Sequence, residues 1–417
     1  MSELSYLEKL MDGVEVEWKT LEDITLRTSN IKWREAIRSY RYIDLTSVDI
    51  ATKKIIETTE ITKNNAPSRA QKLVDENDVI FATTRPTQQR FCLIDSEYAG
   101  AVASTGYCIL RAKKDQVLPK WILHWISTSD FKKHVEENQS GSAYPAISDS
   151  KVKECLIPIP CPDNPEKSLA IQSEIVRILD KFTALTAELT AELTAELNMR
   201  KKQYNYYRDQ LLSFEDGEVE WKALGTICQI GDGNHSSKYP KANEMIEQGI
   251  PFIRGTNMVN GTICNQDMKY ISKEKHNELK KGHLKAFDVL IANRGEVGKV
   301  AYVPEGYSGS NLNSQLAWLR ANPEIIINRY LFFILCSSTI QNKLSGEGGA
   351  LQQLTIKNIK NIQIPVPSIT VQSNIVSFLD KFDSLTNSIS EGLPREIELR
   401  QKQYEYYRDL LFSFPKP

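Results

Sequence analysis

The sequence predicts an α+β protein made of two related halves, each with a globular α+β domain followed by a long helical segment. The main evidence is a tandem duplication, because four segments recur in the same order in the second half of the chain. The inserts between them, about 140 residues in each half, match poorly. The recurring pairs are Val16–Lys19 with Val219–Lys222, Ile157–Pro160 with Ile364–Pro367, Ile171–Thr186 with Val371–Thr386, and Arg200–Phe214 with Arg400–Phe414.

Each insert has the pattern of an α+β domain. Residues 77–82 and 287–292 each predict a strand that enters a polar loop. A Gly/Ser-rich loop and a short helix are expected just before the paired prolines. Between the first strand and the Gly/Ser-rich loop, we expect β-rich runs at 105–110 and 315–319 and apolar helices at 121–127 and 330–336. We therefore expect a first domain at 1–162, a spacer helix at 163–214, a second domain at 215–367 and a C-terminal helical segment at 368–417.

The first helical segment contains three consecutive Thr-Ala-Glu-Leu units. Neither Gly nor Pro occurs between Glu166 and Asp216, so one helix of roughly 47 residues, beginning near Pro165 or Ser168, is expected. Apolar residues upstream follow a coiled-coil 4-3 spacing, and each four-residue unit adds a stutter. We interpret the repeat as a spacer, although leucines at this spacing also suit a buried stripe. The spacer positions are Thr186, Leu189, Thr190, Leu193, Thr194 and Leu197.

The C-terminal copy of this helical segment contains Glu391-Gly392-Leu393-Pro394. Gly and Pro disfavour the interior of a helix, so one helix should end here and another begin. We expect the second segment to be kinked or split near 392–394.

Composition limits the class of protein only loosely. The formal net charge is −1, but residues 222–370 carry 17 Lys and Arg against 11 Asp and Glu, and residues 19–165 carry 21 against 19. Such mildly basic domains could suit phosphate contacts. Seven scattered Cys without a C-x-x-C pair fit reduced thiols. With no signal peptide or membrane-length apolar run, the protein is expected to be soluble, cytoplasmic and without a membrane partner.

Known catalytic and cofactor-binding motifs are missing. The nearest approach to a phosphate loop, at 295–300, has the wrong spacing, and no dinucleotide fingerprint or Asn-Pro-Pro-aromatic tetrapeptide occurs. His276 and His283 are more simply solvated side chains than metal ligands. We therefore expect no catalytic residue and no metal site, and a protein that binds.

Polar loops that combine Arg with amide side chains follow the two matched strands. Arg can grip guanine and Asn or Gln can grip adenine, each through two hydrogen bonds in the major groove. An ordinary hairpin loop is the alternative. Two Gly-rich loops add weaker candidates. The candidate DNA-binding residues are Arg85, Gln88, Gln89, Arg90 and Tyr144 in the first insert, and Asn293, Arg294, Lys299, Gln352 and Gln353 in the second.

Both helical segments end in K-Q-Y-x-Y-Y-R-D. Aromatic and basic residues alternate there, which would suit nucleic acid. On a helix, however, the tyrosines continue an apolar 3-4 stripe, so an interhelical or subunit contact is favoured. The residues concerned are Tyr204, Tyr207, Tyr404 and Tyr407.

Taken together, the tandem half-repeat, the dissimilar inserts, the T-A-E-L units and the K-Q-Y-x-Y-Y-R-D-x-L-L blocks resemble the specificity (S) subunit of a type I restriction-modification enzyme. The likeness is greatest to the subclass whose members vary in their number of T-A-E-L units. It covers essentially the whole chain. The resemblance implies two target-recognition domains, each binding one half of a split DNA sequence, held apart by two antiparallel coiled-coil helices.

The resemblance also implies partners. Two methyltransferase (M) subunits would dock on the helices, and two motor-nuclease restriction (R) subunits would assemble on them. S-adenosylmethionine would belong to the methyltransferase, ATP and Mg²⁺ to the motor subunit, and no cofactor to this chain. Two other classes stay open from the residues: a coiled-coil adaptor joining two protein-binding domains, and a self-sufficient DNA methyltransferase, which the missing motifs oppose.

Overall fold

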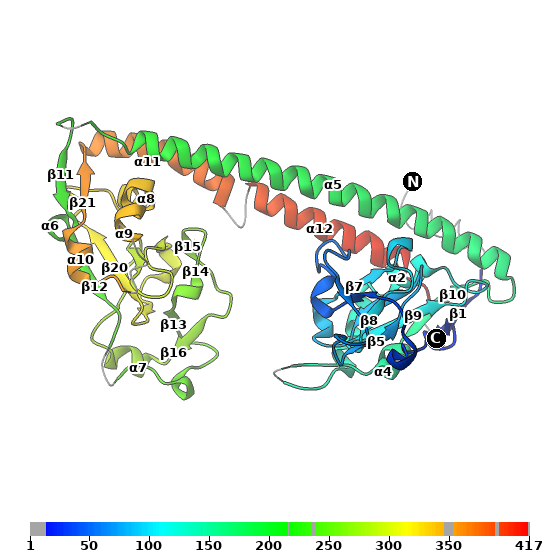
Figure 1. The fold of residues 1–417 in the computed structure, drawn as a ribbon. Coiled ribbons are helices and arrows are strands. Elements are labelled where there is room, and N and C mark those ends of the chain that lie inside the picture. The colour runs from blue at the N-terminus through cyan, green and yellow to red at the C-terminus, as the bar shows by residue number, and fades with distance from the viewer. Residues whose placement is uncertain are drawn as a thin grey trace. The chain divides into compact units, whose positions relative to one another are not determined.

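The computed structural model describes residues 14–142, 144–215, 217–235, 238–345, 353–387 and 392–415. The chain divides into two compact units, one formed by residues 1–189 with 399–417 and the other by residues 190–398. Each unit contains one globular domain together with helical segments (Figure 1). The first unit thus combines the N-terminal domain with the C-terminal end of the chain.

The domain of the first unit contains two four-stranded sheets. One is antiparallel with strand order β2-β9-β6-β7, and the other has order β4-β3-β8-β5 with β3 and β8 parallel. The strands are β2 (Thr25–Leu26), β3 (Tyr40–Ile43), β4 (Thr59–Ile61), β5 (Ala70–Leu73), β6 (Val79–Ala82), β7 (Phe91–Leu93), β8 (Val102–Ser104) and β9 (Tyr107–Ala112). The helices are η1 (Trp33–Glu35), η2 (Leu45–Ser47), η3 (Pro86–Gln88), η4 (Ser96–Tyr98), α2 (Pro119–Trp125), α3 (Ser129–Asn138) and α4 (Asp149–Lys153).

The domain of the second unit repeats this plan. Its antiparallel sheet has order β12-β20-β17-β18, and a smaller sheet has order β16-β13-β19 with β13 and β19 parallel. The strands are β12 (Cys228–Asp232), β13 (Ile250–Ile253), β14 (Met258–Val259), β15 (Thr262–Ile263), β16 (Lys269–Ile271), β17 (Val289–Ala292), β18 (Val300–Tyr302), β19 (Asn311–Leu312) and β20 (Leu316–Ala321). The helices are α6 (Leu224–Ile227), η5 (Ala242–Glu244), η6 (Gly255–Asn257), α7 (Lys273–Glu278), η7 (Glu305–Tyr307), α8 (Asn328–Cys336), α9 (Ser338–Ser345) and α10 (Ile356–Asn361).

The recurring V-E-W-K and proline-pair segments form a two-stranded antiparallel sheet in each half. β1 (Val16–Thr20) pairs with β10 (Leu156–Pro160), and β11 (Glu220–Ala223) pairs with β21 (Gln363–Val366). The chain therefore enters and leaves each domain at one place. This pairing was not predicted from the sequence.

The long spacer helix is confirmed as α5 (Pro165–Leu211), with 47 residues. At ~1.5 Å per residue it is about 70 Å long. The side chain of Asn164 caps it by accepting a hydrogen bond from the backbone N–H of Lys167 at 3.0 Å. The second helical segment contains α11 (Ile369–Asn387) and α12 (Gly392–Leu411). The expected end of the first of these helices at Glu391 lies outside the described residues, so the break stays a prediction.

The helical segments are antiparallel where they pack within each unit. In the first unit the Thr183 and Tyr404 hydroxyls lie 2.9 Å apart, and the Phe182 ring packs 5.9 Å from that of Tyr407. In the second unit Tyr207 packs 5.9 Å from Phe382. As residue numbers rise along one segment, those of its partners fall, which confirms the antiparallel arrangement.

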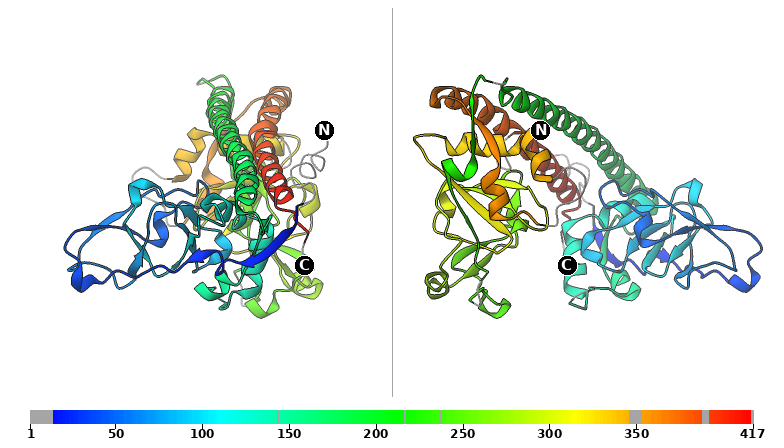
Figure 2. Two further views of the ribbon diagram at one scale, coloured as in Figure 1. Left: turned by 90° about the vertical axis from the view of Figure 1, so that its right-hand side faces the viewer. Right: turned by 60° about the vertical axis from the view of Figure 1, so that its left-hand side comes forward.

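The C-terminal end of α12 completes the core of the first domain. Phe412 is almost fully buried, and its ring centroid lies 4.6 Å from that of Trp121 and 5.5 Å from that of Trp125. The indole N–H of Trp18 donates to the carbonyl of Pro415 at 2.7 Å. Figure 2 shows this red end of α12 reaching the blue and cyan domain. Residues 412–415 therefore belong to the first domain's fold.

Side chains at matched positions of the duplication fasten each domain to its helices. Fully buried Gln172 accepts from the backbone N–H of Leu118 at 2.9 Å, and Gln372 accepts from that of Ile327 at the same distance. Each Gln also donates to a nearby carbonyl at 3.0 Å. Such buried and satisfied amides fix an orientation. Gln172 and Gln372 therefore make matching attachments between a helix and a domain in the two halves.

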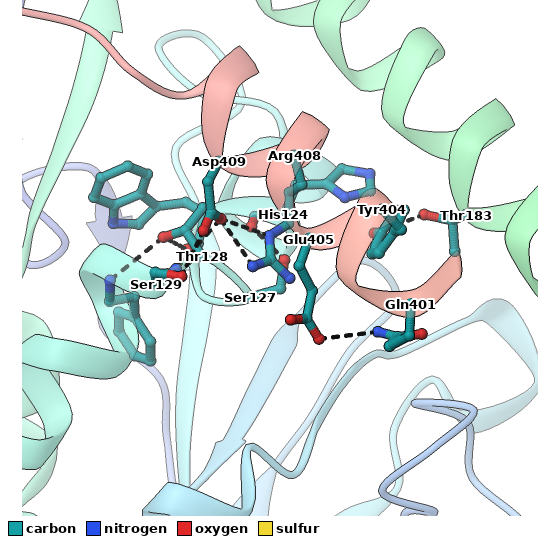
Figure 3. A network of polar contacts seen from close by, with 12 residues as sticks. His124, Ser127, Thr128, Ser129, Thr183, Gln401, Tyr404, Glu405, Arg408 and Asp409 are labelled. Carbon is teal, nitrogen blue, oxygen red and sulfur yellow. Dashed lines mark hydrogen bonds and ion pairs between the residues drawn. The ribbon is translucent and has the colours of Figure 1, made fainter. Parts of the chain in front are cut away.

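The Arg-Asp pair that ends each K-Q-Y-x-Y-Y-R-D block has a similar role. Figure 3 shows Asp409 at the start of α3, where it accepts hydrogen bonds from the backbone N–H and hydroxyl of Ser129. Asp209 does the same for Ser338 at the start of α9. Burial alone would raise the pKa of Asp209, but the Ser338 hydrogen bonds and the Arg208 cation outweigh it and lower that pKa. A carboxylate at a helix N-terminus is favoured by the exposed N–H groups there.

Candidate nucleic-acid interface

The first polar loop, residues 83–90, is held by backbone hydrogen bonds at the end of strand β6. The N–H of Thr83 donates to the carbonyl of Gly106 at 2.8 Å, and the N–H of Arg85 donates to that of Pro145 at 2.7 Å. Thr84 also forms a β-bridge with Ala146. The loop and the Gly/Ser-rich loop at 139–146 are therefore joined into one surface.

Three of the predicted residues are exposed on this surface. Arg85 has a left-handed φ of 49°, and its guanidinium carbon lies 5.0 Å from the ring centre of Tyr144. Tyr144 is 71% exposed, and Gln88 is exposed as well. A cation stacked on an aromatic ring is oriented without losing its hydrogen-bond donors. Arg85 can therefore present its planar donors to a base edge.

The other two residues of this loop are used by the fold. Arg90 donates from one guanidinium nitrogen to the carbonyls of Leu45 at 2.6 Å and Val48 at 2.7 Å. The side-chain amide of Gln89 is buried, with no hydrogen-bond partner among the described residues. The Lys53 ammonium donates to the carbonyl of Gln89, and burial lowers the pKa of Lys53 to about 8. Gln89 and Arg90 thus shape the loop instead of presenting their side chains.

The second polar loop, residues 293–299, follows β17 with the same backbone plan. The N–H of Asn293 donates to the carbonyl of Gln315 at 2.9 Å, and its carbonyl accepts from Leu354 at 2.9 Å. Arg294 forms a β-bridge with Gln353, as Thr84 does with Ala146. The two loops therefore occupy equivalent places in the two domains.

The side chains of the second loop differ in exposure. Arg294 and Gln353 are exposed, and no described residue pairs with the Arg294 guanidinium. Asn293 is buried, and its side-chain oxygen has no partner among the described residues. Lys299 forms an ion pair with Glu296. Gln352, also predicted, lies outside the described residues.

An Arg-Asp pair braces the strand that leads to each loop. Asp78 is nearly inaccessible and binds Arg111 through two hydrogen bonds of 2.8 and 2.7 Å. Asp288 binds Arg320 with the same two distances. The hydrogen bond to Asp78 raises the pKa of Arg111. Two parallel bonds between planar groups define an orientation, so the pair fixes the strand against its neighbour in the sheet.

The spacer positions lie outside the hydrophobic cores. Within α5 no described residue from Phe182 to Gln203 is fully buried, and the leucines of the T-A-E-L units are half-buried. Side chains of α5 enter the first core near Ile175 and Leu179 and the second at Tyr204. Along α5, the repeat therefore lies between the residues that enter the two cores, and its role as a spacer stays a prediction.

The four predicted contact tyrosines pack between helices of this chain. Tyr204 is buried in the core of the second unit, where burial raises its pKa, and Tyr207 packs against Phe382 in the same unit. Tyr404 and Tyr407 contact α5 in the first unit. The middle tyrosine of each block, Tyr206 or Tyr406, is exposed.

A cationic segment at residues 27–41, which matches no known motif, also belongs to the first domain's surface. It contains five Lys and Arg residues and one acidic residue. This local excess of positive charge is the sequence feature that could have identified the segment. No group of three or more His, Cys, Asp or Glu within the described ranges is placed to hold a metal ion. Likewise, no helix in the described part of the chain has the length and apolarity needed to cross a membrane.

The chain belongs to the type I restriction-modification DNA specificity family. The profile of the "Type I restriction modification DNA specificity domain" matches it twice, at residues 14–199 and 217–399. The two matches coincide with the two halves of the duplication. The class expected from the repeated blocks is thus confirmed.

Two curated relatives match all or nearly all of the chain. The chain is 43% identical over 425 residues to the type I restriction enzyme EcoR124I/EcoR124II specificity subunit of Escherichia coli, covering 100% of this chain and 99% of that one. It is 36% identical to the EcoprrI specificity subunit of the same species, covering 94% and 93%. A chain in a solved type I restriction-modification system shares the fold, with a TM-score of 0.68, 23% identity, and coverage of 95% and 97%.

Proposed function

We propose that this subunit recognises a bipartite sequence in duplex DNA, one half with each domain, and directs adenine methylation to it. The observation that supports this proposal is that Arg85 and Arg294 are both exposed on matched loops of two dissimilar domains. The framework of the two halves is the same, whereas the residues beside each Arg differ. Two related but unlike domains on one scaffold suit a target with two unlike halves.

We further propose that the chain is the non-catalytic partner in a larger complex. Two methyltransferase subunits, matching the two equivalent framework halves, would carry S-adenosylmethionine. Two restriction subunits would carry ATP and Mg²⁺ and cut DNA. A first test uses the isolated chain, which should neither methylate nor cleave DNA. Adenine methylation by the chain alone would refute the assignment.

The recognition residues can be tested through Arg85→Ala and Arg294→Ala. A bidentate contact between Arg and guanine discriminates against the wrong base by about 1–3 kcal/mol, so each change should relax specificity in one half-site only. The measurement is genome-wide mapping of methylated adenines, with each variant assembled with its methyltransferase. The half-site bound by the unchanged domain serves as the internal control.

Arg85→Lys separates base recognition from charge. Lys keeps the positive charge but lacks the planar pair of donors. If Arg85 contacts a base, Lys should fail to restore specificity. If Lys restores binding, and Ala weakens binding to all sequences equally with a shallower salt dependence, Arg85 is a phosphate contact instead. A coiled-coil protein adaptor would show no DNA preference in any variant.

A further inference from the structure

Ile37 stands out as the most exposed large hydrophobic residue in the described chain. Its side chain is 99% exposed, compared with 71% for Tyr144. Single exposed apolar residues are common on protein surfaces. Ile37 differs because the residues on both sides of it are fixed.

The neighbours of Ile37 are anchored to the first domain. The Trp33 indole N–H donates to the carbonyl of Ala70 at 2.8 Å, and Ala36 is buried. On the other side, the Arg38 guanidinium carbon lies 4.6 Å from the ring centre of Tyr40, the first residue of β3. Ile37 is therefore the exposed tip of a segment that is anchored on both sides. Ordering its side chain on a ligand would cost little conformational entropy.

The segment around this tip is strongly cationic. Residues 27–41 contain five Lys and Arg and one Glu, a formal +4, whereas residues 19–165 together carry only +2. The rest of the first domain is therefore net negative. Lys32 pairs with Glu35 at 3.4 Å and Arg41 pairs with Glu97 at 2.6 Å. Three guanidinium groups, at Arg27, Arg34 and Arg38, have no carboxylate partner among the described residues.

The second domain lacks this feature at the matched position. Ile246 lies four residues before β13, much as Ile37 lies three residues before β3. It is 42% exposed, and Glu244 and Glu247 flank it. Acidic neighbours would repel a phosphate backbone. Ile246 is therefore a matched position without the cations.

We propose that residues 27–41 form a second DNA contact in the first domain, with Arg34 and Arg38 on backbone phosphates and Ile37 in the adjacent groove. This inference rests on the proposed DNA-recognition function. Unpaired guanidinium groups suit phosphate oxygens, and an exposed apolar tip suits a thymine methyl group or a base step. The contact would lie at the opposite end of β3 from the 44–48 turn that Arg90 holds. The first domain would then bind DNA at both ends of this sheet.

The test measures DNA affinity of the full chain assembled with its methyltransferase, over a series of salt concentrations. Arg34→Ala with Arg38→Ala should reduce the slope of log affinity against log salt by about one to two, since each phosphate contact contributes roughly 0.9. The matched pair Arg34→Lys with Arg38→Lys should retain the slope. Ile37→Ala should weaken binding roughly tenfold at unchanged slope, because three buried carbons are lost. Ile246→Ala should leave affinity unchanged.

Two outcomes would overturn this inference and leave the proposed function intact. In the first, the wild-type complex binds its target and neither the Arg nor the Ile37 variants change affinity or slope. In the second, these variants weaken assembly with the methyltransferase at an unchanged DNA slope, which would assign the segment to a protein contact. A wild-type complex with no preference for any duplex sequence would instead remove the proposed function, and this inference with it.

Discussion

Deleting one T-A-E-L unit, Thr190–Leu193, should alter the distance between the two DNA half-sites. No residue of this unit is fully buried, so its loss leaves both hydrophobic cores intact. Four residues fewer shorten α5 by about 6 Å and rotate the C-terminal part of the helix by about 40°, because four steps of ~100° exceed one turn. The helix should remain continuous across the deletion.

These values correspond closely to one base pair. A base pair advances the DNA axis by ~3.4 Å and turns it by roughly 34–36°. The rotation of the shortened helix nearly matches that of one base pair, while its shortening of about 6 Å exceeds the rise of one base pair. The opposing segment keeps its length and contains Gly392 and Pro394, so we expect the excess to be taken up there. The deletion should therefore retain both half-sites and shorten the unspecified spacer by one base pair.

Mapping of methylated adenines with the two-unit variant measures this spacing directly. The matched control is the double substitution Thr190→Ala with Leu193→Ala, which removes the side chains but keeps the helix length. Its spacing should be that of the wild type. If the deletion variant methylates the same half-sites at the original spacing, the spacer interpretation is wrong. If both variants lose assembly or stability alike, the repeat acts through packing.

Three further predictions concern the domains and their attachment. Exchanging residues 20–156 for those of a relative should change one half-site and leave the other unchanged in methylation mapping; a change in both would show that the domains are not independent. Asp409→Ala and Asp209→Ala should each lower the free energy of urea unfolding by about 1 kcal/mol, as loss of a helix-capping carboxylate does, and unaltered unfolding would exclude this role. Because burial lowers the pKa of Lys53 to about 8, the unfolded chain binds more protons than the folded chain between about pH 8 and 10.5. Wild type should therefore gain roughly 1–2 kcal/mol of unfolding free energy relative to Lys53→Met as pH rises through that window, after allowing for partial solvent screening; parallel pH profiles would contradict the buried ammonium.

The sequence was sufficient for features whose causes are local. The span of α5 follows from the lack of Gly and Pro after Glu166. The strands β6 and β17 follow from short apolar runs bounded by polar residues. Each of these depends on side chains within a few positions of one another, so a pattern in the chain reports it.

Features that depend on distant contacts could not be found in this way. The partner of Asp409 is Ser129, 280 residues away, and only the folded chain brings them together. Proline pairs argue against a strand, yet β10 contains Pro158 and Pro160 and pairs with β1. Arg90 looked as suitable for DNA as Arg85, but its guanidinium bonds to backbone carbonyls of a turn far away in sequence. Loop residues of the same type are thus distinguished by the tertiary structure alone.

The small β1·β10 and β11·β21 sheets bring the two ends of each inserted domain together. Thr20 lies opposite Leu156, and Ala223 lies opposite Gln363, so the two ends of each insert are neighbours. An insert can then be lengthened, shortened or replaced without displacing the helical segments. The second insert is already four residues longer than the first between these points. Recombination at the two short recurring segments would move an entire domain as a cassette. The DNA sequence recognised by that half would then change, while the helical segments stayed the same.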